Sequence, residues 1–383
     1  MIVIFLLGAA AVLLLHGYVY SRNWFRSLSV RVMFSQPHVC AHDTLELTEV
    51  IENRKRMAVP VVEIGFRVPR GLHFEDADNT LESDFIYKRD IFAVSGMERI
   101  VRRYRITAQR RGFYSVSQLT CHAPSRLFHR IYMMDRMAQD EDAGLYVYAA
   151  NVNCSLLLRA VEVILGENES ARRVYEDPFV FSSIRPYTIQ DPMKSVNWKA
   201  TAKAGELMVN TFASTSAVRV RIFLDVSADP LVPFSDSFRE YGISMAASLI
   251  RSLVKKQLDA SLIVNAPAAG SAQDEPGVTR FLSCFGAAKV TAVEEYLASD
   301  FYSKKISSFE DMIRHETAAD TRSVYDSEMF VFITSQDTPS LRLAVLDILG
   351  AAGSGILALL SRSADRRIQE RVGGLYVLPV CDD

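Results

Sequence analysis

The apolar run at the N-terminus constrains the fold of this chain most, because it decides whether the first helix lies in lipid or in water. Every residue from Ile2 to Leu15 is apolar or glycine, and the first charged side chain is Arg22. Counted to Ser21, the charge-free stretch would extend about 30 Å as a helix, which matches the hydrocarbon thickness of a bilayer. The sequence therefore predicts a transmembrane anchor over residues 1–21.

A cleaved signal peptide and a buried helix of a soluble protein are the alternatives for the same run. No Lys or Arg precedes it, so the basic segment of a secretory signal is missing, and no small-x-small cleavage site follows it. The aromatic residues that follow are of the kind that gather at membrane interfaces: Tyr18, Tyr20, Trp24 and Phe25. These features favour a retained, single-pass anchor whose partner is the lipid bilayer.

Basic residues decide how such an anchor is oriented. Arg22, Arg26 and Arg31 lie just after the span, whereas only the α-amino group lies before it. Because cytoplasmic flanks carry an excess of Lys and Arg, this asymmetry predicts a cell-membrane protein with its C-terminal body in the cytoplasm. The five cysteines are odd in number and widely spaced, which is typical of reduced thiols in that compartment.

Residues 28–149 carry a strand-like pattern. Apolar and polar side chains alternate over Ser29–Phe34, Thr44–Ile51 and Val61–Val68, and turn-forming residues separate the runs. Alternation with a period of two places every second side chain on one face of a strand. Several short strands of this kind predict an antiparallel β-sandwich.

Residues 217–383 change to an alternation of strands and helices. Val218–Asp225 has the apolar character of a strand, and apolar residues then recur at helical spacing from Phe238 to Leu253. Further apolar runs follow, including Met329–Thr334. This order predicts an α/β doubly wound sheet of mostly parallel strands. The expected fold class is therefore α+β multidomain, with residues 150–216 as a connecting segment.

The connecting segment holds an unusual concentration of aromatic and charged residues. Arg185 and Asp191 are expected to pair, and Tyr187, Trp198 and Lys199 lie close to them in the chain. In one interpretation Trp198 is wedged between the domains while the ion pair fixes the loop. In the other the segment is a docking surface, because Trp, Tyr and Arg dominate interface hot spots. The sequence leaves both open.

The same residues follow a recognisable order: Arg185-x-Tyr187, then Asp191, then Val196-Asn197-Trp198, then Ala200-Thr-Ala-Lys203. This order resembles the signature of the bacterial "domain of unknown function 58" family. Arg110–Tyr114 and Gly205–Val209 resemble further stretches of that family. Gln190 and Lys194 depart from its usual residues, and Ser125–Phe128 departs from its usual Pro-x-Gly-Leu-Phe stretch. Many members have two membrane helices where this chain has one, so the chain is similar to a divergent member.

The resemblance implies that residues 217–383 form a domain like the von Willebrand factor A domain. It also implies a partner, because members are commonly encoded beside AAA+ ATPases of the MoxR type and are thought to act with them in assembling or maturing complexes. No catalytic activity is established for the family. We therefore expect an AAA+ ATPase or another protein as the partner of this chain.

A candidate metal site follows the strand Val218–Asp225. Asp225, Ser227 and Asp229 place oxygen side chains at alternate positions past the strand, where they could converge on a hard cation such as Mg²⁺. The metal-dependent adhesion site of the family's fold uses Asp-x-Ser-x-Ser, so Asp229 replaces the last Ser. In the alternative interpretation Asp225 caps the following turn through backbone amides. Both interpretations remain open at this point.

Arginines are frequent in the second half of the sandwich region, at positions 99, 102, 103, 105, 110 and 111. Arg103 and Arg105 alternate with Tyr104 and Ile106, which is typical of a half-buried strand with one solvated face. Anionic lipid is the alternative partner for such a face. The net charge of the chain is only −2, and we expect no nucleic-acid partner.

Catalytic motifs are missing from the sequence: it contains no Gly-x-Ser-x-Gly, phosphate-binding Gly-x-x-x-x-Gly-Lys, His-Glu-x-x-His or Gly-x-Gly-x-x-Gly pattern. We therefore predict a non-enzymatic, membrane-anchored adaptor. Two alternatives stay open. One is a membrane-bound hydrolase with Asp191, Asp225 and Asp229 as its acids, and the other is a metal-dependent adhesion module.

Overall fold

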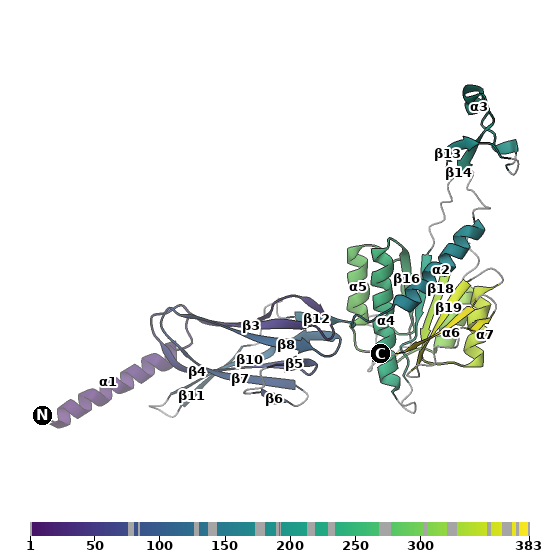
Figure 1. Cartoon of the computed structure of the whole chain (residues 1–383). Helices are drawn as coiled ribbons and strands as arrows, with labels where there is room; N and C mark the ends of the chain where they lie inside the picture. Colours follow the sequence, from purple (N-terminus) through teal and green to yellow (C-terminus); the bar gives the residue numbers. More distant parts are fainter. Residues whose placement is uncertain are drawn as a thin grey trace. The chain divides into compact units, whose positions relative to one another are not determined.

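The computed structural model describes residues 2–75, 80–82, 85–125, 130–136, 144–172, 181–188, 191, 193–212, 219–228, 234–267, 277–301, 305–319, 328–350, 354–361, 370–372 and 375–381. The chain divides into two compact units (Figure 1). The first contains Met1–Asn151 with Leu297–Asp300, and the second contains Val152–Tyr296 with Phe301–Asp383.

Helix α1 (Ile2–Asn23) begins the first unit. Its residues from Ile2 to Leu15 are apolar or glycine and exposed, and the helix contains no proline, so its backbone pairs internally. Within the described residues, Ile2–Tyr20 is the one helical stretch long and apolar enough to cross a membrane. At 22 residues the helix is about 33 Å long. The predicted apolar N-terminal helix is confirmed.

A joint connects α1 to the sandwich. Trp24, directly after the helix, is only 4% exposed and belongs to the core of the sandwich. The ammonium group of Lys55 donates hydrogen bonds to the carbonyl oxygens of Trp24 and Arg26, and burial lowers the pKa of Lys55. The Arg54 amide donates to Ser27 O at 2.9 Å. These contacts satisfy carbonyls of the turn that follows α1, and they tie that turn to the loop after strand β3.

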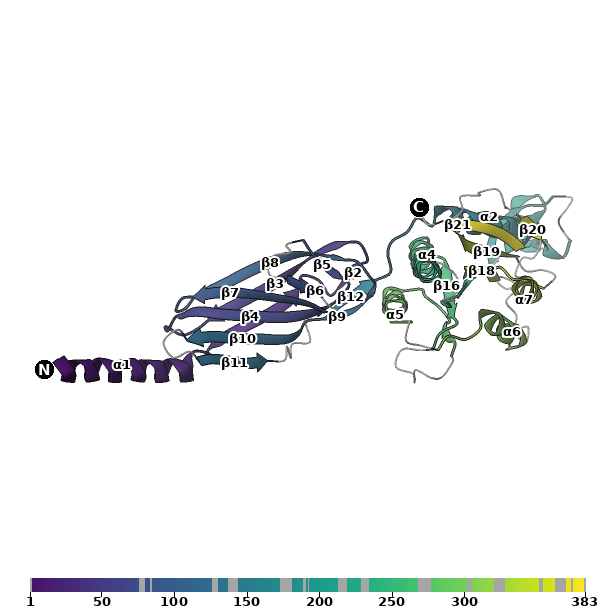
Figure 2. The ribbon, with the colours of Figure 1, turned by 90° about the horizontal axis from the view of Figure 1, so that it is seen from below.

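The sandwich is built mostly from antiparallel strands (Figure 2). One sheet has the order β1 (Leu28–Phe34), β3 (Thr44–Asn53), β8 (Arg99–Ala108), β5 (Leu72–Phe74). The facing sheet has the order β11 (Arg130–Arg136), β10 (Ser117–Ser125), β4 (Val59–Pro69), β7 (Phe85–Val94), β6 (Thr80–Glu82). A third has the order β2 (His38–Cys40), β12 (Gly144–Tyr148), β9 (Gly112–Ser115), in which β2 and β12 are parallel. The predicted antiparallel β-sandwich is confirmed.

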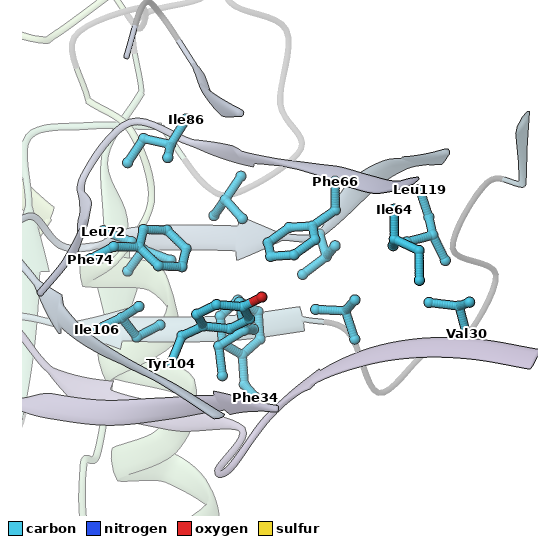
Figure 3. Packing of buried hydrophobic residues seen from close by; sticks show 14 of the residues in the cluster. Val30, Phe34, Ile64, Phe66, Leu72, Phe74, Ile86, Tyr104, Ile106 and Leu119 are labelled. Atoms are coloured by element: carbon cyan, nitrogen blue, oxygen red, sulfur yellow. The ribbon is translucent and has the colours of Figure 1, made fainter. Parts of the chain in front are cut away.

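Alternation of buried and exposed residues builds the core of this unit. In β4, every second side chain from Val62 to Val68 is buried. Tyr104 of β8 lies among apolar side chains of the interior (Figure 3). Its ring centroid is 6.2 Å from those of Phe66 and Phe74, in edge-to-face contacts. The predicted inward direction of Tyr104 and Ile106 is confirmed.

The second unit contains a mostly parallel sheet. Its described strands have the order β17 (Thr279–Phe281), β16 (Asp259–Val264), β15 (Arg219–Leu224), β18 (Glu328–Thr334), β19 (Ser354–Ser361), β21 (Leu375–Cys381), β20 (Glu370–Val372). The two outermost strands pair antiparallel, and the five between them are parallel. The longer described helices of this part are α2 (Ser155–Arg172), α4 (Ser235–Lys255), α5 (Ala287–Leu297), α6 (Phe309–Ala319) and α7 (Pro339–Leu349). The order of strands and helices follows the predicted alternation.

Helices cover both faces of this sheet. Phe223 and Phe332 pack in a cluster with residues of α6 and α7. Leu224 and Ile333, their neighbours in the chain, lie against Gly242 of α4, where an added Cβ would be 3.8 Å from a Leu224 methyl and 3.7 Å from an Ile333 methyl. Consecutive residues of a strand point to opposite faces, so α4 lies on one face and α6 with α7 on the other.

The stretch 150–216 contains regular structure that the sequence interpretation did not assign. Helix α2 buries Leu157, Val161 and Ile164, and it packs on α4. Val152 N donates to Ser248 Oγ at 3.1 Å at the start of this contact. The buried residues recur at i, i+4 and i+7, which is the spacing of one helix face.

Candidate functional site

The signature residues form a small module, defined here as residues 181–212. Strands β13 (Phe181–Pro186) and β14 (Met208–Phe212) pair antiparallel, and a 3₁₀ turn η2 (Met193–Ser195) and helix α3 (Trp198–Ala204) lie between them. The Tyr187 amide donates to Leu207 O at 2.8 Å, which continues the pairing past β13. The hairpin thus brings the two ends of the signature together.

Arg185 and Asp191 form the predicted pair. The guanidinium donates two hydrogen bonds to the carboxylate, from Nη1 to Oδ2 at 2.6 Å and from Nη2 to Oδ1 at 2.7 Å. The amide and hydroxyl of Thr188 each donate to Oδ2 at 2.8 Å. Arg185 first, and then Thr188, hold the pKa of Asp191 well below its usual range. A carboxylate stabilised in this way takes up a proton poorly, so it is a weak general base.

Helix α3 is set by its two caps. Asn197 Oδ1 accepts the Ala200 amide at 3.0 Å, and Gly205 adopts φ 75° where the helix ends. Asn197 Nδ2 also donates to Asn210 Oδ1 of β14 at 2.7 Å. Asparagine is a preferred N-cap and glycine a preferred residue after the last turn. The caps therefore fix the backbone that carries Trp198, the first residue of the helix.

Trp198 is 64% exposed. The predicted ion pair between Arg185 and Asp191 is present, and both interpretations of the segment stay predictions. Ile184, Met193 and Leu207 are also exposed. The module carries exposed lysines as well, namely Lys194, Lys199 and Lys203. Among the described side chains of the module, only those of Val196 and Val209 are buried. The module is therefore held together by hydrogen bonds rather than by an apolar core.

The second candidate site lies where β15, β16 and β18 end. Asp225 is buried, and its Oδ1 accepts the Ser227 amide at 3.0 Å, the Ser227 hydroxyl at 2.5 Å and Asn265 Nδ2 at 2.8 Å. Its Oδ2 accepts the Thr334 hydroxyl at 2.7 Å. Gln336 Nε2 donates to Ser227 Oγ at 3.2 Å. The predicted capping of the turn by Asp225 is confirmed.

Donors of the chain itself bond both carboxylate oxygens of Asp225, three of them at Oδ1 and one at Oδ2. The predicted metal site at Asp225 and Ser227 stays a prediction. No group of three or more His, Cys, Asp or Glu that could hold a metal occurs in the described part of the chain. Asp229 lies outside the described residues. Asp337, three residues after the end of β18, pairs with Arg342, which lowers the pKa of Asp337.

Thr334→Val is expected to destabilise this edge of the sheet by about 2 kcal/mol, because it leaves a buried carboxylate oxygen of Asp225 without its donor. The measurement is amide hydrogen exchange of strand β18 in the full chain. Thr291→Val is the control, since that threonine lies exposed on α5 and bonds only its own helix. Equal exchange in both variants would show that the Thr334–Asp225 contact contributes nothing.

Sequence reasoning missed a group inside the sandwich, the acid–tyrosine cluster of Glu49, Asp90 and Tyr104. All three side chains are buried. The Tyr104 hydroxyl lies 2.8 Å from Glu49 Oε2 and 2.6 Å from Asp90 Oδ2. Lys88 Nζ lies 5.3 Å from the centre of the tyrosine ring, and Arg102 Nη1 lies 3.1 Å from Asp90 Oδ1. In the alternating strand β3, Glu49 occupies an inward position between Leu47 and Ile51. This position in the alternation is the sequence feature that could have predicted a buried acid.

The hydrogen bonds of the acid–tyrosine cluster determine which of its two acids carries a proton. A tyrosine hydroxyl has one proton, so it can donate to only one of two acids, and the other acid must donate to it. Arg102 Nη1 pairs with Asp90 Oδ1 at 3.1 Å. Glu49 Oε1 is buried and accepts no hydrogen bond from the described residues. Burial raises the pKa of Glu49 to about 7. The proton therefore belongs on Glu49.

The predicted solvated face of the arginine-rich strand is present. Arg103 and Arg105 are exposed, and each lies near an acid, with 4.0 Å from Arg103 Nε to Glu46 Oε2 and 3.5 Å from Arg105 Nη1 to Glu75 Oε2. Such exposed pairs contribute little to stability because water screens them.

Comparison with known proteins leaves the family open. No model of a known family matches the chain, and no curated protein matches it. A CARDB domain from Pyrococcus furiosus is similar at 12% identity and a TM-score of 0.19, over 32% of this chain and 92% of that one. A cohesin from scaffoldin B of Acetivibrio cellulolyticus is similar at 8% identity and a TM-score of 0.22, over 31% of this chain and 99% of that one. These likenesses are to sandwich domains and carry no conclusion about function.

Proposed function

We propose that this chain is a single-pass membrane adaptor that presents the signature module to a protein partner in the cytoplasm. The observation that carries the proposal is the exposed Trp198 on a backbone fixed by the Arg185–Asp191 pair and the caps of α3. An exposed tryptophan on a rigid support buries a large apolar area at low entropic cost when a partner covers it. A surface of this kind suits recognition.

The charge of the module supports an acidic partner surface. Residues 181–212 contain four basic and two acidic side chains, which gives a net charge of +2. The lysines Lys194, Lys199 and Lys203 are exposed around the apolar residues. Opposite charge on the partner would steer the encounter, while Trp198 would supply most of the affinity.

The resemblance to the "domain of unknown function 58" family supports a MoxR-type AAA+ ATPase as that partner and complex assembly or maturation as the task. The same resemblance, together with the mostly parallel sheet covered on both faces, supports a von Willebrand factor A-like domain in the second unit. The arginines after α1 support a cytoplasmic body. Asp191 and Asp225 are both engaged by donors of the chain, which favours an adaptor over a hydrolase.

Capture of partners from native membranes tests the proposal. The full chain is extracted in mild detergent and isolated in the presence of ATP, ADP or a slowly hydrolysed ATP analogue. Recovery of an AAA+ ATPase in at least one nucleotide state is the expected result. Failure to recover an ATPase in any of the three would contradict this assignment of the partner.

A further inference from the structure

Two loops meet at the end of the sandwich where α1 ends. The loop between β3 and β4 contains Lys55, whose ammonium group bonds the last carbonyls of the joint. The loop between β7 and β8 contains Met97, whose amide donates to Lys55 O at 2.9 Å. A Cβ on Gly96 would lie 2.1 Å from Arg56 O, so the two loops pack closer than any side chain there would allow. Both loops are thus held beside the end of the helix.

The surface around this point is basic. We define the collar as Arg22, Arg26, Arg54, Arg56 and Met97, all of which are exposed. The acids close to it are engaged by the chain itself. Glu52 pairs with Arg54 at 2.9 Å, and Glu98 accepts the Ser95 amide at 2.5 Å. With Lys55 included, five basic and two acidic side chains give the region a net charge of +3.

Met97 forms the tip of its loop. Its side chain is 70% exposed, and its backbone has φ 60°, a left-handed conformation that residues other than glycine seldom adopt. The hydrogen bond to Lys55 O and the close contact at Gly96 hold the loop in this conformation. An unbranched apolar side chain is therefore kept outside the sandwich core.

We propose that the collar rests on anionic lipid headgroups and seats the sandwich against the membrane. The inference depends on the proposed function, because it requires α1 to span the bilayer. A helix of 22 residues is about as long as the hydrocarbon core is thick, so Arg22 and Arg26 lie at headgroup depth on one side. Arg54 and Arg56 come to the same depth, because their loop bonds the end of the helix.

Anionic headgroups fit this surface better than neutral ones. An arginine close to an anionic leaflet contributes about a fivefold gain in binding, and the effect decays over a Debye length of about 10 Å. The collar is within that range of the surface because it is continuous with the anchor. Met97 can enter the interfacial layer between headgroups, where an apolar side chain gains free energy.

The test uses the full chain reconstituted in vesicles of phosphatidylcholine, with or without phosphatidylglycerol. Amide hydrogen exchange is measured for residues 54–57 and 95–98. We expect exchange to be at least about fivefold slower in the vesicles that contain phosphatidylglycerol. Arg56→Glu should remove most of this difference. Arg70→Glu is the matched control, because Arg70 is exposed at the far end of the 11-residue strand β4, about 36 Å away.

Extraction with alkaline carbonate separates the possible failures. If the chain leaves the vesicles on extraction, α1 does not anchor it, and both the proposed function and the collar are wrong. If the chain stays but the two loops exchange equally in both lipids, only the collar is wrong. Equal loss of the lipid effect in Arg56→Glu and Arg70→Glu would also overturn the collar, because the effect would then depend on net charge. Unchanged exchange of β3 and β8 confirms that both variants are folded.

Discussion

Glu49→Gln is expected to remove most of the loss of sandwich stability that occurs as the pH rises from about 4.5 to about 7. In the folded chain the pKa of Glu49 is raised from 4.5 to about 7, chiefly by burial. Between these values the folded state keeps a proton that the unfolded state releases. The free energy of unfolding must therefore fall with rising pH through this window and level off above it. Integrated over the window, the change is about 3 kcal/mol.

Glutamine retains the shape of the protonated acid and cannot ionise. At pH near 4.5 the variant and the native chain should have similar stability, and at pH 8 the variant should be the more stable one. Urea unfolding of the full chain in detergent measures this difference. Trp24 reports on the sandwich because it is buried in the core, whereas Trp198 is already exposed.

Glu46→Gln is the matched control, since Glu46 lies on the same strand and is half exposed. It should leave the pH profile unchanged. A profile that is equally steep in Glu49→Gln and the native chain would mean that the proton of the acid–tyrosine cluster is elsewhere, with Asp90 the remaining acid.

Trp198→Ala is expected to weaken partner binding by about 30-fold or more, while the chain stays folded. Central tryptophans at interfaces cost 2 kcal/mol or more on truncation, which corresponds to about that factor. Removing an exposed ring does not open a cavity, so the stability of the module should be nearly unchanged. Quantitative capture of the ATPase by the native and variant chains gives the ratio.

Phe285→Ala is the control for this experiment. Phe285 is an exposed aromatic residue outside the module, 43% accessible, and its loss should leave capture unchanged. Hydrogen exchange at the Thr188 amide, which bonds Asp191, verifies that the module is intact. Equal capture by the native chain and Trp198→Ala would contradict the role of the module in docking.

Local patterns predicted much of the fold. The alternation over Thr44–Ile51 predicted strand β3, and the helical spacing from Phe238 to Leu253 predicted helix α4. Both patterns depend only on residues that are close in sequence. Arg185 and Asp191 are six residues apart, so their pairing was also predictable. Helix α2 and its buried face were not predicted, although apolar residues recur at helical spacing in that part of the sequence.

Contacts between distant segments could not be predicted in the same way. Capping of the turn by Asp225 was one of two interpretations, but its partners Asn265 and Thr334 lie 40 and 109 residues further along the chain. Glu49 meets Tyr104 across 55 residues, and nothing near Glu49 in the sequence identifies its partner. Such polar contacts depend on which strands lie side by side, and strand order follows from global packing rather than from periodicity.

The joint has a mechanical consequence. Trp24 is packed in the core of the sandwich, and Lys55 bonds carbonyls of the turn that follows α1. The helix and the sandwich are therefore expected to tilt together. A spanning helix adapts to bilayer thickness by tilting, on average by about 20°. A tilt of that size would swing the far end of the 11-residue strand β4 sideways by about 12 Å. If α1 spans the bilayer as proposed, changes in membrane thickness would then displace the far end of the sandwich.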